Sequence, residues 1–267
     1  MLFEWRLFQT NLFVHDCIFR QAQYDNRRNV FKKKLMIQLE QLQEIFEKHP
    51  VEEALKQITQ LFPGGVKFSS SFGQEDQVLT DIIARHKIPI NIFTIDTGRL
   101  FNEAYETIEK TSARYKLNID VYFPQADAVQ KMVSEKGVNL FYESVENRQT
   151  CCGVRKVEPL NRALKDTSVW ITGLRASQTE HRSHIPVVEW LEDKKIYKIN
   201  PLLHWSFDDI LNYIKAFSVP YNPLHDKGFV SIGCAPCTRA IEPGEDPRAG
   251  RWWWEVSHKE CGLHLVK

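Results

Sequence analysis

Short runs of β-favouring residues alternate with helical segments through the middle of the chain, and this alternation constrains the fold more than any other feature. The runs cover residues 66–72, 90–95, 119–123, 169–174 and 197–202. They are bounded by turn-forming residues, as strands are. Strands that alternate with helices form a mostly parallel sheet covered by helices. The sequence therefore predicts an α/β fold with a mostly parallel, twisted sheet flanked by helices.

The regions on either side of these runs have different patterns. Apolar residues recur at helical spacing over 35–47 and again over 51–61, after Pro50. Residues 1–34 lack a clean period and are interpreted as an N-terminal extension, with a helix pair packed on the domain as the alternative. Residues 35–233 are expected to form one nucleotide-binding domain. Residues 234–267 are rich in Gly, Pro, Arg and Trp, which predicts a loop-like, mobile C-terminal segment.

The charge balance excludes some classes of partner. Lys and Arg number 35 against 34 Asp and Glu, a formal net charge of +1, so no global field favours nucleic acid or an anionic membrane. Charged residues interrupt every apolar stretch well before the ~20 residues of a spanning helix. Glu4, Arg6 and Asp16 likewise interrupt the apolar start of the chain, so a secretory signal is not expected. We expect a cytoplasmic enzyme whose thiols lie in a reducing compartment.

A hydroxyl-rich turn, SSSFGQED at 69–76, follows the first predicted strand and precedes a helical pattern. A strand, such a turn and a helix N-terminus together place N–H groups and hydroxyls where a phosphate or sulfate would bind. The alternative is that Ser and Asp only cap the helix. No Gly-Lys-Ser/Thr motif is present in this turn, so hydrolysis of ATP is disfavoured.

Two further strands end in polar turns, TIDTGR at 94–99 and WITGLR at 170–175. Each could be an ordinary strand-to-helix turn. The carboxyl ends of parallel strands are, however, where such sheets bind ligands, and Gly173 would permit the close approach of a ligand. The three turns together predict one pocket.

Four of the six cysteines form two pairs, Cys151-Cys152 and Cys234-Ala-Pro-Cys237. Four thiolates are the number that closes a zinc site or an iron-sulfur cluster. Adjacent ligands point apart and suit a multi-iron cluster better than one ion, and this geometry favours iron-sulfur over zinc when taken together with the family resemblance given below. Buried structural thiols are the remaining alternative.

Basic and aromatic residues accompany these cysteines in the sequence. Arg155 and Lys156 follow the first pair and could offset thiolate charge or reach an anionic substrate. Arg248 and Arg251 could bind a doubly anionic group by paired hydrogen bonds. The tryptophans at 252–254 are expected to anchor the segment by packing, the alternative being that they stack on a base.

Cys261 lies outside the two pairs, in KECGLH at 259–264. Lys259 and His264 are close to it in sequence and could lower the pKa of its thiol, and the thiolate is the nucleophile. The alternative is an unreactive terminal cysteine. The basic residues just upstream favour a nucleophile.

These motifs resemble those of the assimilatory adenylylsulfate (APS) reductases and, more distantly, the phosphoadenylylsulfate (PAPS) reductases. The resemblance runs from about residue 35 to the C-terminus and is carried by SSSFGQED, IDTGR, CCGVRK, WITGLRASQT, GCAPC and ECGLH. It implies an adenine nucleotide alpha hydrolase-like fold. It also implies one 4Fe-4S cluster per subunit, held by Cys151, Cys152, Cys234 and Cys237.

The same resemblance implies a reaction in sulfate assimilation and cysteine biosynthesis. Cys261 attacks the sulfur of APS, AMP leaves, and an S-sulfocysteine remains until thioredoxin or glutaredoxin releases sulfite. Lys156 and His264 are the other implied catalytic residues. The implied substrate contacts are Ser70, Ser71, Gly73, Asp76, Ile95, Thr97, Gly173, Arg182, Arg248 and Arg251. The chain has Phe72-Gly73 where many relatives have Ser-Gly, and Cys17 has no counterpart in the family.

Several alternatives stay open at this point. The enzyme could prefer PAPS or accept both nucleotides. An ATP-dependent tRNA-thiolating enzyme should have a glycine-rich SGG loop and a basic surface, and neither is evident. A non-catalytic iron-sulfur nucleotide sensor would not need Cys261. The sequence does not decide whether the chain is a homo-oligomer or whether the cluster is redox-active, although Lys156 beside the cysteines favours an electrostatic role.

Overall fold

The computed structural model describes residues 35–36, 38–178 and 182–255, and these are the residues meant by "described" below. The chain divides into two compact units between Lys48 and His49. In the first unit, residues 35–36 and 38–48 are helical, as the spacing over 35–47 predicts. The N-terminal extension with Cys17, and residues 256–267 with Cys261 and His264, lie outside the described residues.

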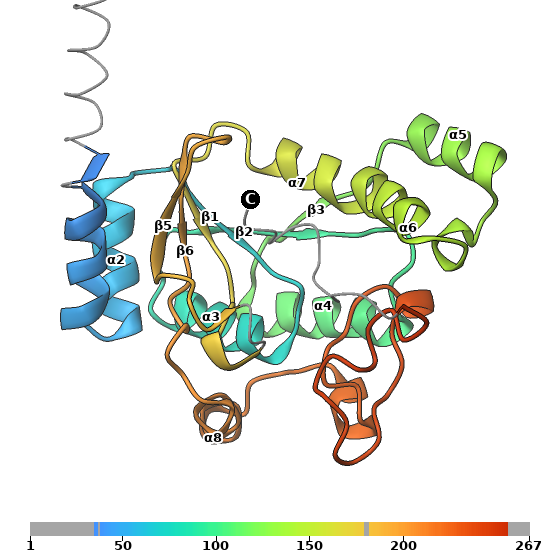
Figure 1. Cartoon of the computed structure of the whole chain (residues 1–267). Coiled ribbons are helices and arrows are strands. Elements are labelled where there is room, and N and C mark those ends of the chain that lie inside the picture. Colours follow the sequence, from blue (N-terminus) through green and yellow to red (C-terminus); the bar gives the residue numbers. More distant parts are fainter. Residues whose placement is uncertain (1–34, 37, 179–181, 256–267) are drawn as a thin grey trace, which may run out of the picture. The chain divides into compact units, whose positions relative to one another are not determined.

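The second unit contains a six-stranded sheet in the order β3-β2-β1-β4-β6-β5 (Figure 1). The strands are β1 (Val66–Ser69), β2 (Asn91–Ile95), β3 (Asp120–Tyr122), β4 (Val169–Ile171), β5 (Val188–Leu191) and β6 (Ile196–Ile199). The pairs β3-β2, β2-β1, β1-β4 and β4-β6 are parallel, and β5 pairs antiparallel with β6 at the edge. All five predicted runs therefore form strands, and the mostly parallel sheet is confirmed.

The edge strand β5 is absent from the sequence prediction. It joins β6 through a tight turn in which Lys195 adopts a left-handed conformation with φ 56°. The loop has four residues, 192–195, so it lacks the two-residue Asn-Gly or Asp-Gly turn that marks a hairpin most strongly, and its left-handed position would usually carry Gly or Asn. Here a lysine occupies the position, so the hairpin leaves little trace in the sequence.

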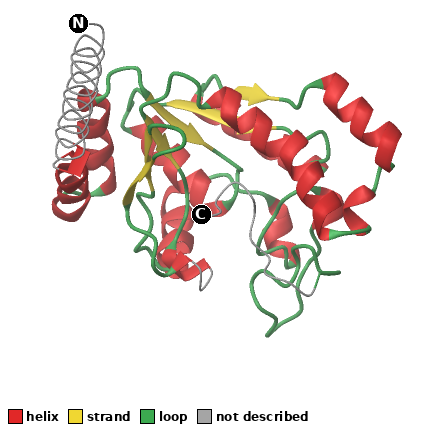
Figure 2. Cartoon of the chain, turned by 45° about the horizontal axis from the view of Figure 1, so that its top comes forward, coloured by secondary structure: helices red, strands yellow, loops and turns green. Residues whose placement is uncertain are grey.

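Helices cover both faces of the sheet (Figures 1 and 2). The α-helices are α2 (Val51–Leu61), α3 (Gln74–Arg85), α4 (Asn102–Tyr115), α5 (Ala126–Lys136), α6 (Val145–Cys152), α7 (Glu158–Ala163) and α8 (Phe207–Phe217). The short helical turns are η1 (Leu140–Tyr142), η2 (Gly153–Val157), η3 (Ala176–Gln178), η5 (Pro223–Lys227) and η6 (Ala235–Cys237). In Figure 1, α7 lies on one face and α3 and α4 on the other. In the part of the chain that the structure describes, no helix combines the length and apolar character needed to span a membrane.

The central strands are buried on both faces, as strands of a covered parallel sheet are. Every residue of β4 and β6 is buried, and Phe68 of β1 is fully enclosed. The chain runs from β1 outward to β2 and β3 and then returns to β4 on the other side of β1. The strand order thus reverses between β1 and β4. In open α/β sheets, the carboxyl ends of strands at such a reversal diverge and leave a crevice for a ligand.

Residues 234–255 have the loop-like backbone that the sequence predicts. Apart from η6, they contain an isolated antiparallel bridge between Thr238 and Arg251. Their side chains are nevertheless packed: Trp252 is only 1% exposed. This burial agrees with the interpretation of Trp252 as a packing anchor, whereas the next residue, Trp253, is 40% exposed.

Candidate functional site

A cavity of about 990 Å³ lies at the carboxyl ends of β1, β2 and β4. All ten residues that the resemblance implies as substrate contacts line it: Ser70, Ser71, Gly73, Asp76, Ile95, Thr97, Gly173, Arg182, Arg248 and Arg251. Lys156 lines it as well. The structure therefore brings together residues from segments up to about 180 positions apart in the sequence.

The turn after β1 is shaped by its own serines. The Phe72 N–H donates to Ser70 Oγ at 3.2 Å, and the Gly73 N–H donates to Ser71 Oγ at 3.4 Å. Phe72 takes a left-handed conformation, φ 59°, which a buried aromatic residue rarely adopts. No side chain caps α3, whose first residue Gln74 lines the cavity. The alternative that the serines only cap the helix is therefore not supported.

Asp76 ties this turn to the end of β4. Its carboxylate accepts hydrogen bonds from the Ser71 N–H at 2.6 Å and the Ser71 hydroxyl at 2.7 Å. A Cβ atom at Gly173 would overlap Asp76 Oδ1. Burial raises the pKa of Asp76 to about 6, although the Ser71 hydrogen bonds act in the opposite direction. Gly173 thus allows the close approach of Asp76, and not only of the ligand that its sequence context suggested.

Four polar side chains of the cavity wall were not singled out from the sequence. Arg175 Nη2 lies 2.8 Å from Glu75 Oε1, and Gln178 Nε2 donates to the same oxygen at 2.9 Å. His225 also lines the cavity, and both of its ring nitrogens are buried without a hydrogen-bond partner among the described residues. Burial lowers the pKa of His225, which favours the neutral imidazole. Arg175 and Gln178 lie in WITGLRASQT and Glu75 lies in SSSFGQED, so these motifs could have identified three of the four residues, whereas His225 lies in none of the motifs.

The turn after β2 connects the large cavity to a cysteine. Thr97 Oγ1 lies 3.2 Å from Cys234 Sγ, and Arg155 Nη1 donates to the Thr97 carbonyl at 2.6 Å. Asp96 accepts from the Gly98 N–H at 2.7 Å and so holds the turn closed. Thr97 thus lines the large cavity, and its hydroxyl also contacts the CxxC segment.

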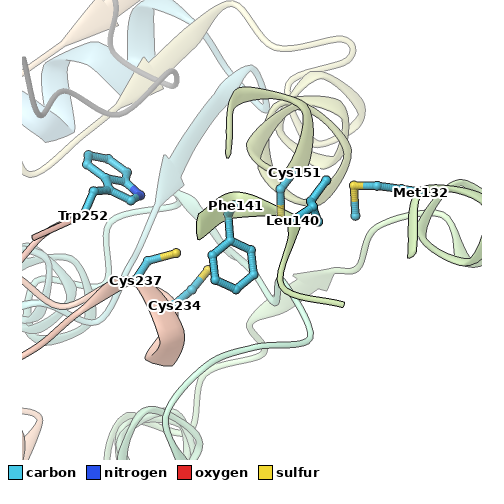
Figure 3. Close-up of a cluster of buried hydrophobic side chains, with 7 residues drawn as sticks. All are labelled: Met132, Leu140, Phe141, Cys151, Cys234, Cys237 and Trp252. Atoms are coloured by element: carbon cyan, nitrogen blue, oxygen red, sulfur yellow. The ribbon is translucent and has the colours of Figure 1, made fainter. Parts of the chain in front are cut away.

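The four paired cysteines line a second, small cavity of about 20 Å³. Cys151, Cys234 and Cys237 are buried and belong to one apolar cluster with Met132, Leu140, Phe141 and Trp252 (Figure 3). Four cationic side chains also line this cavity: Arg99, Arg148, Arg155 and Lys156. The surroundings of the thiols are therefore more apolar than their sequence context indicated, and they are also cationic.

A π-helical turn places two of these cations. Helix α6 ends at Cys152, and residues Gly153–Val157 of η2 form π-helix before α7 begins at Glu158. A π-turn inserts into a helix mostly at functional sites, because it rotates the residues that follow. Arg155 and Lys156 lie in this turn.

The cysteine thiols differ in acidity. Burial raises the pKa of Cys237 to about 12, and the neighbouring Cys234 thiol acts in the same direction. Burial also raises the pKa of Cys151. Burial acts in the same direction on Cys234, but the charge of Lys156 and the Thr97 hydrogen bond outweigh it and lower its pKa. Four thiolates would form here together only if a metal displaced the protons.

Four thiols can hold either a single metal ion or an iron-sulfur cluster. Among the described residues, no three His, Cys, Asp or Glu side chains are grouped closely enough to hold a single metal ion. The four thiols instead surround a common space. Thiolates on different irons of a cluster stand farther apart than the ligands of one zinc ion.

The two cavities share a wall. Lys156 and Cys234 line both of them. A ligand in the large cavity would therefore lie on one side of the Lys156 ammonium, with the four thiols on the other. Because charges interact strongly where water is excluded, each site will respond to the charge in its neighbour.

The C-terminal segment contributes two arginines to the wall of the large cavity. Arg248 and Arg251 line the large cavity, and a Cβ atom at Gly233 would overlap the Arg251 guanidinium. Arg251 is buried and its Nε has no partner among the described residues. Such an orphaned donor is expected where a ligand completes the hydrogen bonding. Cys261 and His264 lie outside the described residues, so their placement is not established here.

Most of the chain is similar in sequence to known sulfonucleotide reductases. The model of the phosphoadenosine phosphosulfate reductase domain matches residues 65–240. Two relatives are named adenosine 5'-phosphosulfate reductase. The one from Burkholderia cepacia is 53% identical over 75% of this chain and 81% of its own length. The one from Allochromatium vinosum is 54% identical over 74% of this chain and 78% of its own.

A solved structure is also similar. The phosphoadenylyl-sulfate (PAPS) reductase from Candida auris, in a phosphate complex, superimposes with a TM-score of 0.65. It is 30% identical in sequence, and the match covers 76% of this chain and 96% of that one.

Proposed function

Since the chain belongs to the phosphoadenosine phosphosulfate reductase domain family, we propose that it reduces adenylyl sulfate (APS) to sulfite and AMP. Its fold is the adenine nucleotide alpha hydrolase-like fold, and it is an oxidoreductase acting on a sulfur compound. One observation carries the proposal: a nucleotide-sized cavity shares Lys156 and Cys234 with a site of four thiols. A nucleotide-binding cavity does not by itself need a four-thiol site beside it, nor does a four-thiol site need such a cavity, so their shared wall indicates a function that uses both.

The large cavity has the parts that APS binding needs. Its volume of about 990 Å³ is ample for a nucleotide. We assign the phosphosulfate to the cations Lys156, Arg248 and Arg251, because guanidinium groups bind such oxyanions by paired hydrogen bonds. Ser70 and Ser71 add donors from the turn at the N-terminus of α3. The ends of β2 and β4 are left for the adenosine.

In the proposed reaction, the Cys261 thiolate attacks the sulfur of APS. A bond between the two sulfur atoms forms as the bond from sulfur to the bridging phosphate oxygen breaks, and AMP leaves with the electron pair. Cys261 is six residues beyond Glu255, the last described residue, so its Cα lies within about 20 Å of that of Glu255. Lys156 and His264 would stabilise the two negatively charged groups that approach each other, the Cys261 thiolate and the phosphosulfate of APS.

The S-sulfocysteine is then reduced by a dithiol protein of the thioredoxin or glutaredoxin type. One of its thiolates attacks the Cys261 sulfur, sulfite leaves with the electron pair, and a mixed disulfide forms. The second thiol of the reductant resolves this disulfide and restores the Cys261 thiol. The reductant supplies both electrons, so the step is balanced. We place this reaction in sulfate assimilation, in the cytoplasm.

We further propose that Cys151, Cys152, Cys234 and Cys237 hold one 4Fe-4S cluster. The shared cavity, the burial of three of the thiols and the four surrounding cations fit a polythiolate cluster that carries negative charge. When bound, the cluster supplies a compact centre of charge beside Lys156. Iron, zinc and sulfide analysis of protein purified without oxygen tests this assignment: about four iron atoms per chain are expected, and stoichiometric zinc without iron would contradict it.

Turnover with the two nucleotides tests the proposed activity. The intact protein, with thioredoxin and its reductase, should release sulfite from APS much faster than from PAPS. Cys261→Ser should abolish sulfite release, whereas Cys17→Ser is a matched control that should leave it unchanged. Equal rates with PAPS would replace the APS assignment by a dual one. An unchanged rate for Cys261→Ser would exclude the mechanism.

A further inference from the structure

A buried ion pair joins the helix of the first cysteine pair to the last described residue of the chain. Arg148 lies in α6, one turn before Cys151 and Cys152, and its Nε donates to Glu255 Oε1 at 2.5 Å. The two side chains are only 6% and 4% exposed. This contact spans 107 residues of sequence. We propose that Arg148 and Glu255 are positioning residues that hold the C-terminal segment against the four-thiol site, so that Cys261 is delivered from a fixed starting point.

Trp252 strengthens the same connection. Its ring lies against two guanidinium groups, with Arg148 at 4.5 Å from the ring centroid and Arg251 at 4.8 Å. Its backbone N–H donates to the Cys237 carbonyl at 3.2 Å, and its carbonyl accepts from the Glu255 N–H at 2.9 Å. Both cysteine pairs are thus linked to the segment that precedes Cys261. The link continues through Arg251 to the wall of the large cavity.

The pair is poorly built for stability alone. Glu255 Oε2 is buried without a hydrogen-bond partner among the described residues. Buried ion pairs often contribute no more than apolar residues of similar size, and an unsatisfied carboxylate oxygen makes this one less favourable still. A half-buried pair in the same segment, Arg239 with Glu245, makes two hydrogen bonds, at 2.8 and 2.9 Å. The buried pair is therefore better explained by the position that it fixes.

The expected size of the effect follows from chain length. Six residues separate Glu255 from Cys261. If the pair is broken, the next fixed point before Cys261 is the bridge between Thr238 and Arg251, and Cys261 lies ten positions beyond Arg251. If that bridge opens as well, the tether starts at Thr238, and Cys261 lies 23 positions beyond it. The effective concentration of a tethered group falls roughly as the −3/2 power of tether length. The thiol should therefore meet its target about two to eight times less often.

The inference rests on the proposed role of Cys261, and its test separates the two. The variants are Glu255→Gln and the conservative Glu255→Asp, with Glu245→Gln in the half-buried pair as the matched control. Three quantities are measured on the holoprotein: iron content, KM for APS, and the rate at which Cys261 is sulfonated in a single turnover. Trypsin cleavage after the buried Arg251 independently reports opening of the segment.

We expect Glu255→Gln to slow sulfonation about two- to eightfold and to speed cleavage after Arg251, with iron content and KM unchanged. Glu255→Asp should recover part of the rate, and Glu245→Gln should match the wild type. If Glu255→Gln leaves both the rate and the cleavage unchanged, or if both variants lose iron and the rate together, the positioning role is wrong. If the wild type does not turn over APS, the proposed function fails, while the cleavage assay still reports on the pair.

Discussion

The two cavities of this protein are assembled in different ways. The large one is built around three turns that each follow a strand and are therefore positioned by their own neighbours in sequence, and the C-terminal segment adds Arg248 and Arg251 to its wall. The small one is made by helix α6, the π-turn η2 and a segment that returns from about 80 residues later. The shape of the large cavity depends mainly on the sheet. The shape of the small cavity depends on tertiary contacts such as that of Thr97 with Cys234. They should therefore fail in different ways when altered.

Removal of a thiol separates the two sites most sharply. Cys237→Ser should abolish iron binding and lower APS turnover by at least about 100-fold, because a metal ligand matters more than its supporting partners. The large cavity does not include Cys237, so AMP should still bind. Iron analysis and calorimetry with AMP measure the two outcomes. Simultaneous loss of AMP binding would show that the cavities are not separable.

Lys156 is shared, so its replacement should affect both sites. Lys156→Met removes the charge that lowers the pKa of Cys234 and a cation from the phosphosulfate site. We expect kcat/KM for APS to fall about 10- to 100-fold, the usual cost of removing a side chain that supports a metal site. Lys156→Arg, which keeps the charge, should lose less. Equal losses in both variants would mean that shape, rather than charge, matters at this wall.

Gly173 belongs to the large cavity alone. A methyl group there would overlap Asp76, so Gly173→Ala should lower the free energy of unfolding by about 1–3 kcal/mol, the usual cost of overpacking. Affinity for AMP should fall while iron content stays unchanged. Denaturation curves and iron analysis provide the measurements. As a matched control, Gly153→Ala introduces a methyl group into open space in a helical turn, so it should leave iron content unchanged and should not lower the free energy of unfolding, which can rise by up to about 1 kcal/mol.

Asp76 gives the smallest expected effect, and it depends on pH. Its pKa of about 6 in the folded protein lies above its ordinary 3.8, so between these values the folded state binds a proton that the unfolded state does not. Stability of the wild type should therefore rise by about 1 kcal/mol relative to Asp76→Asn when the pH falls from 7 to 5. Thermal unfolding of both proteins at the two pH values measures it. If the stability difference between the wild type and Asp76→Asn shrinks or stays constant between pH 7 and pH 5, the pKa of Asp76 in the folded protein is not raised to about 6.

The contrast between the cavities also explains what could be predicted from sequence. The strand runs and the turns after them carry local signals, so the sheet and the residues of the large cavity could be anticipated. The hairpin of β5 and β6 could not, because Lys195 occupies the position where glycine or asparagine would mark the turn. The contact of Asp76 with Gly173 is a second case, since it joins turns almost 100 residues apart.

For the cysteine site, residue types could be read from the sequence but their surroundings could not. The spacing of Cys234 and Cys237 predicted a metal-binding pair without indicating the apolar cluster around it. The partnership of Arg148 with Glu255 has no signature in either segment, because charged residues are abundant throughout the chain. His225 is a further example: only its burial in the cavity wall reveals that its ring nitrogens lack partners.

The central claim is that a nucleotide bound beside the four thiols is attacked by Cys261. It is tested most directly by mixing the oxygen-free holoprotein with APS in the absence of any reductant and following AMP release and the mass of the protein. One AMP should be released per chain, and the peptide that contains Cys261 should carry one sulfonate group. AMP release without a protein adduct, or an adduct on any other residue, would contradict it.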